Sequence, residues 1–82
     1  MWNVYVLLCS DGSFYTGIST NPQQRFLDHT SGRGGAYTRS HKPVKIIYLE
    51  KHPDKSSALK REAQIKSWPR RKKIHFLKLE LI

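Results

Sequence analysis

The side chains of this sequence that are best suited to chemistry on an anionic group are Tyr5, Tyr15, Arg25 and Glu62. A guanidinium binds phosphate oxygens through two parallel hydrogen bonds and stays charged at any working pH. A carboxylate suits a hard divalent cation such as Mg²⁺, which needs few protein ligands. A phenol, with a pKa of about 10, is a weak base unless a neighbouring cation lowers that value. Such groups could together hold a phosphate and a cation and move a proton.

His29 follows Arg25 by four residues, so the two side chains would project from the same side of a helix. An imidazole titrates near neutral pH and can act as an acid, a base or a phosphate donor. We assign no role to the other three histidines, His41, His52 and His75. Ordinary structural roles also stay open for every candidate, because tyrosines pack their rings in many hairpins and surface Arg, Glu and His form ion pairs.

A β-hairpin is predicted to carry both tyrosines. The turn-forming segment Ser10-Asp11-Gly12-Ser13 separates two runs rich in β-branched, aromatic and aliphatic residues. These predicted strands span residues 4–9 and 14–19. A two-residue loop would place Tyr5 and Tyr15 on opposite faces of the hairpin. A three-residue loop with Gly12 in the left-handed region would instead pair Tyr5 with Gly17 and place both tyrosines on the same face. If the tyrosines share a site, the three-residue loop is required.

A helix is predicted next, ending at Thr30 or Ser31. Asn21 can cap it, Pro22 suits its first position, and Gln24 can complete a capping box. Gly32 should end the helix. The residues expected on its core face are Phe26, Leu27 and Thr30.

The remaining elements complete a small α+β domain. Residues 32–42 are predicted to form a flexible glycine-rich loop, and residues 44–50 a third strand. Two helices should follow, over residues 56–67 and 70–79. The first would place Leu59, Glu62 and Ala63 on its apolar face, and the second would bury Ile74, Leu77 and Leu81.

The predicted order is β-β-α-β-α-α, in which helices cover a small three-stranded antiparallel sheet. Eighty-two residues leave room for one domain, residues 1–82. A chain of this length has a small core, so we expect every large apolar residue to belong to it.

The charge balance points to a polyanionic partner. Fifteen Lys and Arg face six Asp and Glu, a net charge of +9, and nucleic acid is the commonest polyanion. An ordinary solvated helix face is an equally good reading of the basic residues between Lys60 and Lys78. An anionic membrane surface fits less well, because no long apolar face accompanies the charge. The residues predicted to contact nucleic acid are Arg33, Arg39, Lys42, Lys66, Arg70, Arg71, Lys72 and Lys73.

Several other classes of protein are excluded. Cys9 is the only cysteine, so an internal disulfide and a cysteine-rich zinc site cannot form. The chain lacks the Gly-x-Ser-x-Gly segment of a serine hydrolase, and its glycine loop lacks the ending of a P-loop. No apolar run approaches a membrane span and the first residues do not form a signal peptide, so we expect a soluble cytoplasmic protein.

Two tripeptides in the hairpin, Val4-Tyr5-Val6 and Tyr15-Thr16-Gly17, have their tyrosines ten residues apart. Pro22, Arg25 and Glu62 follow in matching order on the predicted helices. In these segments and their spacing the sequence resembles the GIY-YIG endonuclease superfamily, in particular its short, single-domain and largely uncharacterised branch.

The resemblance implies a metal-dependent endonuclease that hydrolyses phosphodiester bonds in DNA, with little sequence specificity and a place in DNA repair. Tyr5 would position or deprotonate the attacking water, Tyr15 would orient the phosphate or the water, and Arg25 would hold the scissile phosphate. Glu62 would bind Mg²⁺ or Mn²⁺, and His29 would serve as acid, base or phosphate donor. Many family members also carry a late Asn, but none follows Glu62 here. Either Lys66 or another group replaces this Asn, or the catalytic centre has low activity.

Two other functions stay open. A non-catalytic DNA- or RNA-binding accessory module that keeps the fold would suit the charge of +9 and the missing Asn. A subunit whose basic face docks on an acidic protein is the third reading. The sequence does not decide between DNA and RNA or between duplex and branched substrates, and it leaves the oligomeric state open.

Overall fold

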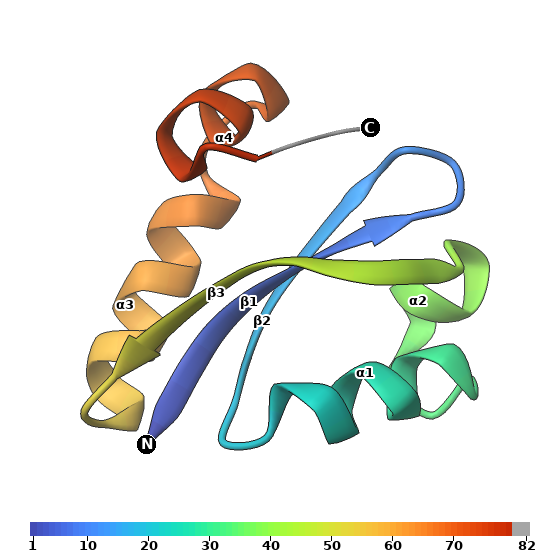
Figure 1. Cartoon of the computed structure of the whole chain (residues 1–82), viewed down its shortest axis with the longest axis horizontal. Coiled ribbons are helices and arrows are strands. Elements are labelled where there is room, and N and C mark those ends of the chain that lie inside the picture. The colour runs from blue at the N-terminus through green and yellow to red at the C-terminus, as the bar shows by residue number, and fades with distance from the viewer. Residues whose placement is uncertain (80–82) are drawn as a thin grey trace.

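The computed structural model describes residues 1–79. Its strands are β1 (Trp2–Cys9), β2 (Phe14–Ser19) and β3 (Pro43–His52), and its helices are α1 (Pro22–Thr30), α2 (Ala36–Ser40), α3 (Lys55–Lys66) and α4 (Arg70–Leu77). The strands form one antiparallel sheet in the order β2-β1-β3, which confirms the predicted α+β class. Figure 1 shows α1 and α2 on one side of the sheet and α3 and α4 on the other. None of the helices in this part of the chain is long and apolar enough to cross a membrane.

The hairpin has the predicted three-residue loop. The Gly12 N–H donates to the Cys9 carbonyl at 2.9 Å, and Gly12 has a φ of 85°, a conformation that glycine adopts without steric cost. The resulting register pairs Tyr5 with Gly17. Because Tyr15 lies two residues before Gly17 on β2, both tyrosines point to the same face of the sheet, as predicted.

Helix α1 begins where the sequence indicated. Asn21 caps it, accepting from the Gln24 N–H at 3.2 Å. The Gln24 side chain donates to Asp28 instead of returning to the cap, so the predicted capping box does not form.

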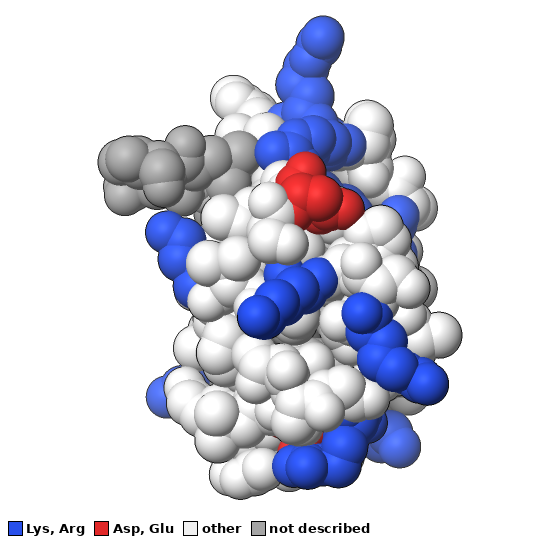
Figure 2. Space-filling view, turned by 90° about the vertical axis from the view of Figure 1, so that its right-hand side faces the viewer, with Lys and Arg blue, Asp and Glu red and all other residues white. Residues whose placement is uncertain are grey.

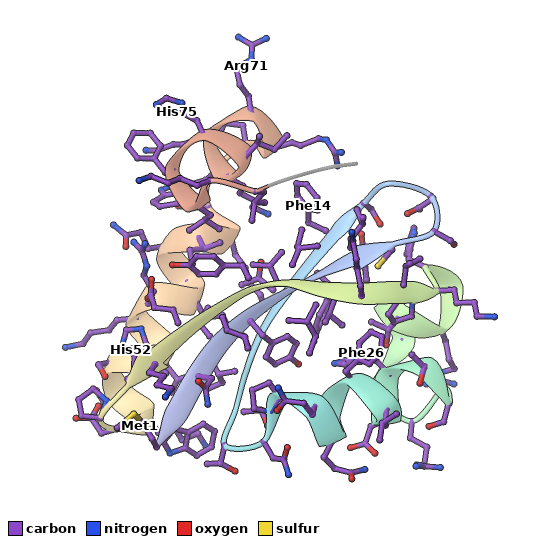
Figure 3. All side chains as sticks on the ribbon, in the orientation of Figure 1. Met1, Phe14, Phe26, His52, Arg71 and His75 are labelled. Carbon is purple, nitrogen blue, oxygen red and sulfur yellow. The ribbon has the colours of Figure 1, made fainter. Side chains whose placement is uncertain are left out.

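The predicted core face of α1 is wrong for Leu27 and Thr30, which are both exposed. The buried residues of this helix are Pro22 and His29, and Figure 3 shows Phe26 on the side that faces the sheet. The helix can turn a histidine inward because both ring nitrogens of His29 find hydrogen-bond partners there, which removes most of the cost of burying them.

Part of the predicted flexible loop is instead the short helix α2. A glycine with a φ of 124°, Gly35, precedes it, and its Thr38 side chain is buried. Five residues carry no apolar period that a sequence pattern could reveal. Contact of Thr38 with α1 holds this helix in place.

The predicted apolar face of α3 is also wrong. Leu59 and Ala63 are exposed, whereas Ala58 and Ile65 are fully buried. Glu62 follows Ala58 by four residues and precedes Ile65 by three, so it shares their face of the helix. Its side chain is accordingly only 18% exposed.

Helix α4 ends at Leu77, two residues before the predicted end, because Lys78 adopts a left-handed conformation with a φ of 53°. Leu77 is buried and Ile74 packs against the core, as predicted, whereas Leu81 lies outside the described residues. The expectation that every large apolar residue is buried is wrong for Met1, Leu27, Val44, Leu49, Leu59 and Phe76.

Alternation along β1 gives the sheet two different faces. Val4 and Val6 point towards α3 and α4 and form an apolar cluster with Ala58 and Ile65. Tyr5, between the two valines, points towards α1 and contacts a histidine. The candidate site lies on this second face.

Candidate active site

A chain of hydrogen bonds links β1, α1 and α2. The Tyr5 hydroxyl oxygen lies 3.0 Å from His29 Nε2, and His29 Nδ1 lies 2.8 Å from Thr38 Oγ1. Tyr5 and His29 are each 1% exposed and Thr38 is 3% exposed. Thr38 Oγ1 also lies 3.5 Å from the Gly35 carbonyl oxygen. Three side chains that are distant in the sequence thus form one buried polar unit.

The contact of Thr38 with Gly35 assigns the hydrogens of this unit. A carbonyl oxygen can only accept, so the Thr38 hydroxyl donates to Gly35. Thr38 Oγ1 then accepts from His29 Nδ1–H, and His29 Nε2 is left to accept the proton of Tyr5. We therefore assign to His29 the tautomer whose free lone pair faces the Tyr5 hydroxyl.

The surroundings keep both ring systems neutral. Burial above all, together with the nearby Tyr15 and Glu62, raises the pKa of Tyr5 to about 12, although the charge of Arg25 opposes this shift. Burial, followed by the charge of Arg25, lowers the pKa of His29 from its usual value of 6.5. At neutral pH Tyr5 therefore keeps its proton, and His29 is an unprotonated acceptor.

Two glycines make room for this arrangement. A Cβ atom on Gly17 would lie 2.5 Å from the Tyr5 hydroxyl oxygen, and a Cβ atom on Gly34 would lie 2.0 Å from His29 Nδ1. Both distances are far below ordinary contact between heavy atoms, about 3.5–4.0 Å. The Tyr5 ring consequently lies directly over Gly17, and the His29 ring lies against the backbone of Gly34.

Tyr15 and Arg25 flank the buried unit. The Tyr15 ring centre lies 6.4 Å from that of Tyr5 and 4.9 Å from that of His29. The Arg25 guanidinium donates to the Gly34 carbonyl at 3.3 Å, and its side chain is 38% exposed. Arg25 is thus anchored at one nitrogen and remains open to an anion arriving from solvent.

Glu62 reaches the same region from the opposite helix layer. Lys66 Nζ lies 3.5 Å from the Glu62 carboxylate and 6.0 Å from the centre of the Tyr15 ring. Because β2 is an edge strand and the Tyr5 ring lies over its Gly17, side chains of α3 can approach the hydroxyl around this edge. The influence of Glu62 on the pKa of Tyr5 agrees with this path.

The chemistry of Glu62 fits a hydrated divalent cation. Mg²⁺ keeps several of its waters and commonly binds one or two carboxylates. Among residues 1–79 there is no group of three or more His, Cys, Asp or Glu that could enclose a metal ion. The partner of Glu62, Lys66, is 52% exposed and can swing into solvent when a cation binds.

The basic residues predicted to contact nucleic acid are distributed around the molecule. Figure 2, which views the side of the hairpin turn and α2, shows Lys and Arg separated by uncharged residues, with few acidic side chains. One predicted contact residue, Arg70, is engaged within the protein, since its guanidinium contacts the Gly12 carbonyl and lies 4.2 Å from the centre of the Phe14 ring. One group lies near α1 and α2 and comprises Arg33, Arg39 and Lys42. The other lies on α3 and α4 and comprises Lys66, Arg70, Arg71, Lys72 and Lys73.

A sequence model of the GIY-YIG catalytic domain matches residues 1–75, and the chain belongs to this family. It is similar to the UPF0213 protein of Staphylococcus aureus strain Mu3, with 44% identity over 75 residues that cover 92% of each chain. Membership of a nuclease family indicates that the protein binds nucleic acid.

Two structures solved by NMR in solution have a similar fold. The UPF0213 protein BH0048 from Bacillus halodurans is 38% identical, with a TM-score of 0.61 over 95% of this chain and 84% of that chain. The protein EF2693 from E. faecalis is 43% identical, with a TM-score of 0.64 over 93% of this chain and 81% of that chain. These similarities confirm the predicted family and fold.

The structure brings together Tyr5, Tyr15, Arg25 and His29, and Glu62 adjoins them through its partner Lys66. The catalytic roles of all five stay predictions. Sequence reasoning missed Thr38 and Gly34, which complete the surroundings of His29. For Gly34 the cluster of three glycines in four residues was a usable signal, because close backbone packing often requires glycine. For Thr38 the sequence offers none.

Proposed function

We propose that the protein is an endonuclease that hydrolyses phosphodiester bonds in DNA with the help of a divalent cation. The observation that carries this proposal is the buried Tyr5–His29 pair, with Arg25 and Glu62 at its side. The net charge of +9 supports a polyanionic substrate held mainly through its phosphates. Such an enzyme would act in the cytoplasm, and DNA repair is the pathway in which to test it.

The Tyr5–His29 pair supplies a path for the proton of the attacking water. With its pKa raised to about 12, Tyr5 offers no phenolate at neutral pH. The water would instead give its proton to the Tyr5 oxygen while Tyr5 passes its own proton to His29 Nε2. The water oxygen forms a bond to phosphorus as the bond from phosphorus to the leaving oxygen breaks. The imidazolium that results keeps its Nδ1–H bonded to Thr38.

Arg25 and Glu62 would stabilise the negative charge of the transition state. The Arg25 guanidinium is anchored on the Gly34 carbonyl and can hold two phosphate oxygens in a fixed orientation. A Mg²⁺ or Mn²⁺ ion bound by Glu62 would supply positive charge at the phosphate and at the leaving oxygen. Tyr15, at the edge of the His29 ring, would limit the positions that the water can take.

Cleavage assays with variants of two glutamates test this function. Purified protein is incubated with plasmid, single-stranded and branched DNA in Mg²⁺ or Mn²⁺. We expect the parent to cleave at least one substrate and Glu62→Gln to be slower by about 100-fold or more. Glu50→Gln is the matched control, because Glu50 is also half-buried (24% exposed) but pairs with Arg61. Equal rates for Glu62→Gln and the parent would remove the proposed mechanism.

One observation favours a second function, that of a DNA- or RNA-binding module without turnover. Lys66 Nζ lies 3.5 Å from the Glu62 carboxylate, in the position where a metal ion bound to this carboxylate would lie. Tight, salt-sensitive binding that is indifferent to Mg²⁺, without cleavage of any substrate, would support this module.

A further inference from the structure

A hollow of about 330 Å³ lies on α4, outside the candidate active site. We name it the α4 groove, and it is lined by Pro69, Arg71, Lys72, His75 and Phe76. In Figure 3 Arg71 and His75 lie at the end of the molecule remote from α1. The hydrogen-bonded unit of Tyr5 and His29 does not contribute to this groove.

Aromatic rings form one wall of the α4 groove. Phe76 is 60% exposed, which is unusual for a large apolar ring in a small protein and marks a candidate binding surface. The Trp68 ring centre lies 5.7 Å from that of Phe76, at an angle of 44° between the ring planes. His75 meets Phe76 edge-on at 5.1 Å. A flat ligand in the groove could therefore stack on the exposed ring of Phe76, which Trp68 supports from outside the lining.

Positive charge accompanies these rings. Lys72 Nζ lies 5.0 Å from the centre of the Trp68 ring and 5.4 Å from that of Phe76. The Arg61 guanidinium lies 5.2 Å from the centre of the Trp68 ring. None of the five lining residues is acidic. A ligand that is both aromatic and negatively charged is complementary to such a surface.

We propose that the α4 groove binds an unpaired base of single-stranded DNA, stacked on Phe76, with Arg71 and Lys72 at the neighbouring phosphates. A base inside a duplex cannot bind in this way, because both of its faces are already stacked on neighbouring bases. The choice of DNA rests on the proposed nuclease function, to which the groove adds a preference for unpaired bases. The molecule measures 29 × 27 × 19 Å, so groove and active site lie within about nine base-pair steps of 3.4 Å.

Fluorescence anisotropy with the full-length protein tests this proposal, in EDTA so that cleavage plays no part. The probes are oligo-dT of about 12 nucleotides, an abasic oligomer with the same number of phosphates, and a blunt duplex. We expect oligo-dT to bind about tenfold more tightly than the abasic oligomer, the effect of one stacked base. Phe76→Ala should abolish this difference and leave binding of the abasic oligomer unchanged.

Two further variants separate stacking from charge. Phe76→Leu keeps an apolar side chain but loses the ring, and it should behave like Phe76→Ala. Lys72→Gln should lower the slope of log affinity against log salt by about one for both single strands. Leu59→Ala is the matched control, because Leu59 is also exposed (44%) but lies on α3, outside the groove.

Equal affinity for oligo-dT and the abasic oligomer would overturn the proposal, and so would equal weakening of both by Phe76→Ala. Dimerisation through Phe76 that DNA does not reverse would assign the groove to a second copy of the chain and also overturn it. A different result would contradict the nuclease proposal alone. If the parent and Glu62→Gln distinguish the two oligomers but neither cleaves DNA, only that proposal falls.

Discussion

The side chains on the two faces of the sheet are buried in different surroundings, apolar on one face and polar on the other. On the side of α3 and α4, Val4 and Val6 pack with Ala58 and Ile65, and the contact is apolar. On the side of α1, Tyr5 and its partners are just as buried but are polar and hydrogen-bonded. Apolar burial stabilises a fold without fixing directions, whereas a buried polar unit must satisfy each donor and acceptor.

This contrast assigns different tasks to the two faces. The α3–α4 face holds the apolar cluster, and the α1 face fixes the positions of groups that could do chemistry. Substitutions in the apolar cluster of the first face should therefore change stability alone, whereas substitutions in the polar unit of the second face should also change the reaction rate. The predictions below test that division, beginning with the largest expected effect.

Ile65→Ala should lower the free energy of unfolding by about 2–5 kcal/mol, because it leaves a cavity in the apolar cluster. Ile65 is fully buried and packs with Val4 and Val6, on the face of the sheet opposite to Tyr5. Urea denaturation measures the loss, and cleavage per folded molecule should stay at the parent level. A variant that keeps its stability but loses cleavage would reverse the division of tasks.

Arg25→Ala should slow DNA cleavage by about 10²–10³-fold, because a charged donor aimed at the phosphate is lost. Its effect on unfolding should be below about 1 kcal/mol, since the ion pair of Arg25 with Asp28 is long, at 3.8 Å, and partly exposed. Initial rates and a urea curve on the same preparation give both quantities. A large stability loss with an unchanged rate would show that Arg25 is structural.

Thr38→Val should destabilise the protein by about 1–3 kcal/mol, because His29 Nδ1–H would be left buried without an acceptor. Thr38→Val should also cleave DNA more slowly than the parent, whereas Thr38→Ser keeps the hydroxyl and should cleave at close to the parent rate. If Val and Ser variants cleave at the same rate, the hydroxyl has no part in holding His29.

The acidic limb of the pH–rate profile should lie below pH 6.5, the usual pKa of histidine. Burial and the charge of Arg25 lower the pKa of His29, so the ring stays an unprotonated acceptor until the pH falls through that lowered value. Below it, the rate should drop about tenfold per pH unit. Cleavage rates between pH 5 and pH 8 would show this limb, and a limb above 6.5 would contradict the assignment of His29.

Local sequence signals were enough for some parts of the site. Of the loop lengths considered for the Ser10-Asp11-Gly12 turn, only three residues place Tyr5 and Tyr15 on the same face. The observed strand register is the one that this loop length gives. Likewise Asn21 and Pro22 define the start of α1, which fixes where Arg25 falls. Turn and cap chemistry involve only neighbouring residues, so they can be read without knowledge of the rest of the fold.

The inward faces of α1 and α3 could not be predicted in the same way. Leu27 and Leu59 are more apolar than His29 and Glu62, yet the leucines are exposed and the polar residues are turned inward. The orientation depends on partners from distant elements, such as Thr38 for His29. Helix α3 has few apolar residues and no strong period of its own, so tertiary contacts decide which of its sides is buried.

The most direct test of the catalytic centre compares two hydrogen-bonded tyrosines that lie on opposite faces of the sheet. Tyr5 donates to His29, and Tyr48 donates to Glu50 on the other side. Single-turnover cleavage of one DNA substrate is measured with excess protein for the parent, Tyr5→Phe and Tyr48→Phe. We predict that Tyr5→Phe is slower by about 10²–10⁴-fold and that Tyr48→Phe cleaves at the parent rate per folded molecule. Cleavage by Tyr5→Phe at the parent rate would contradict the account.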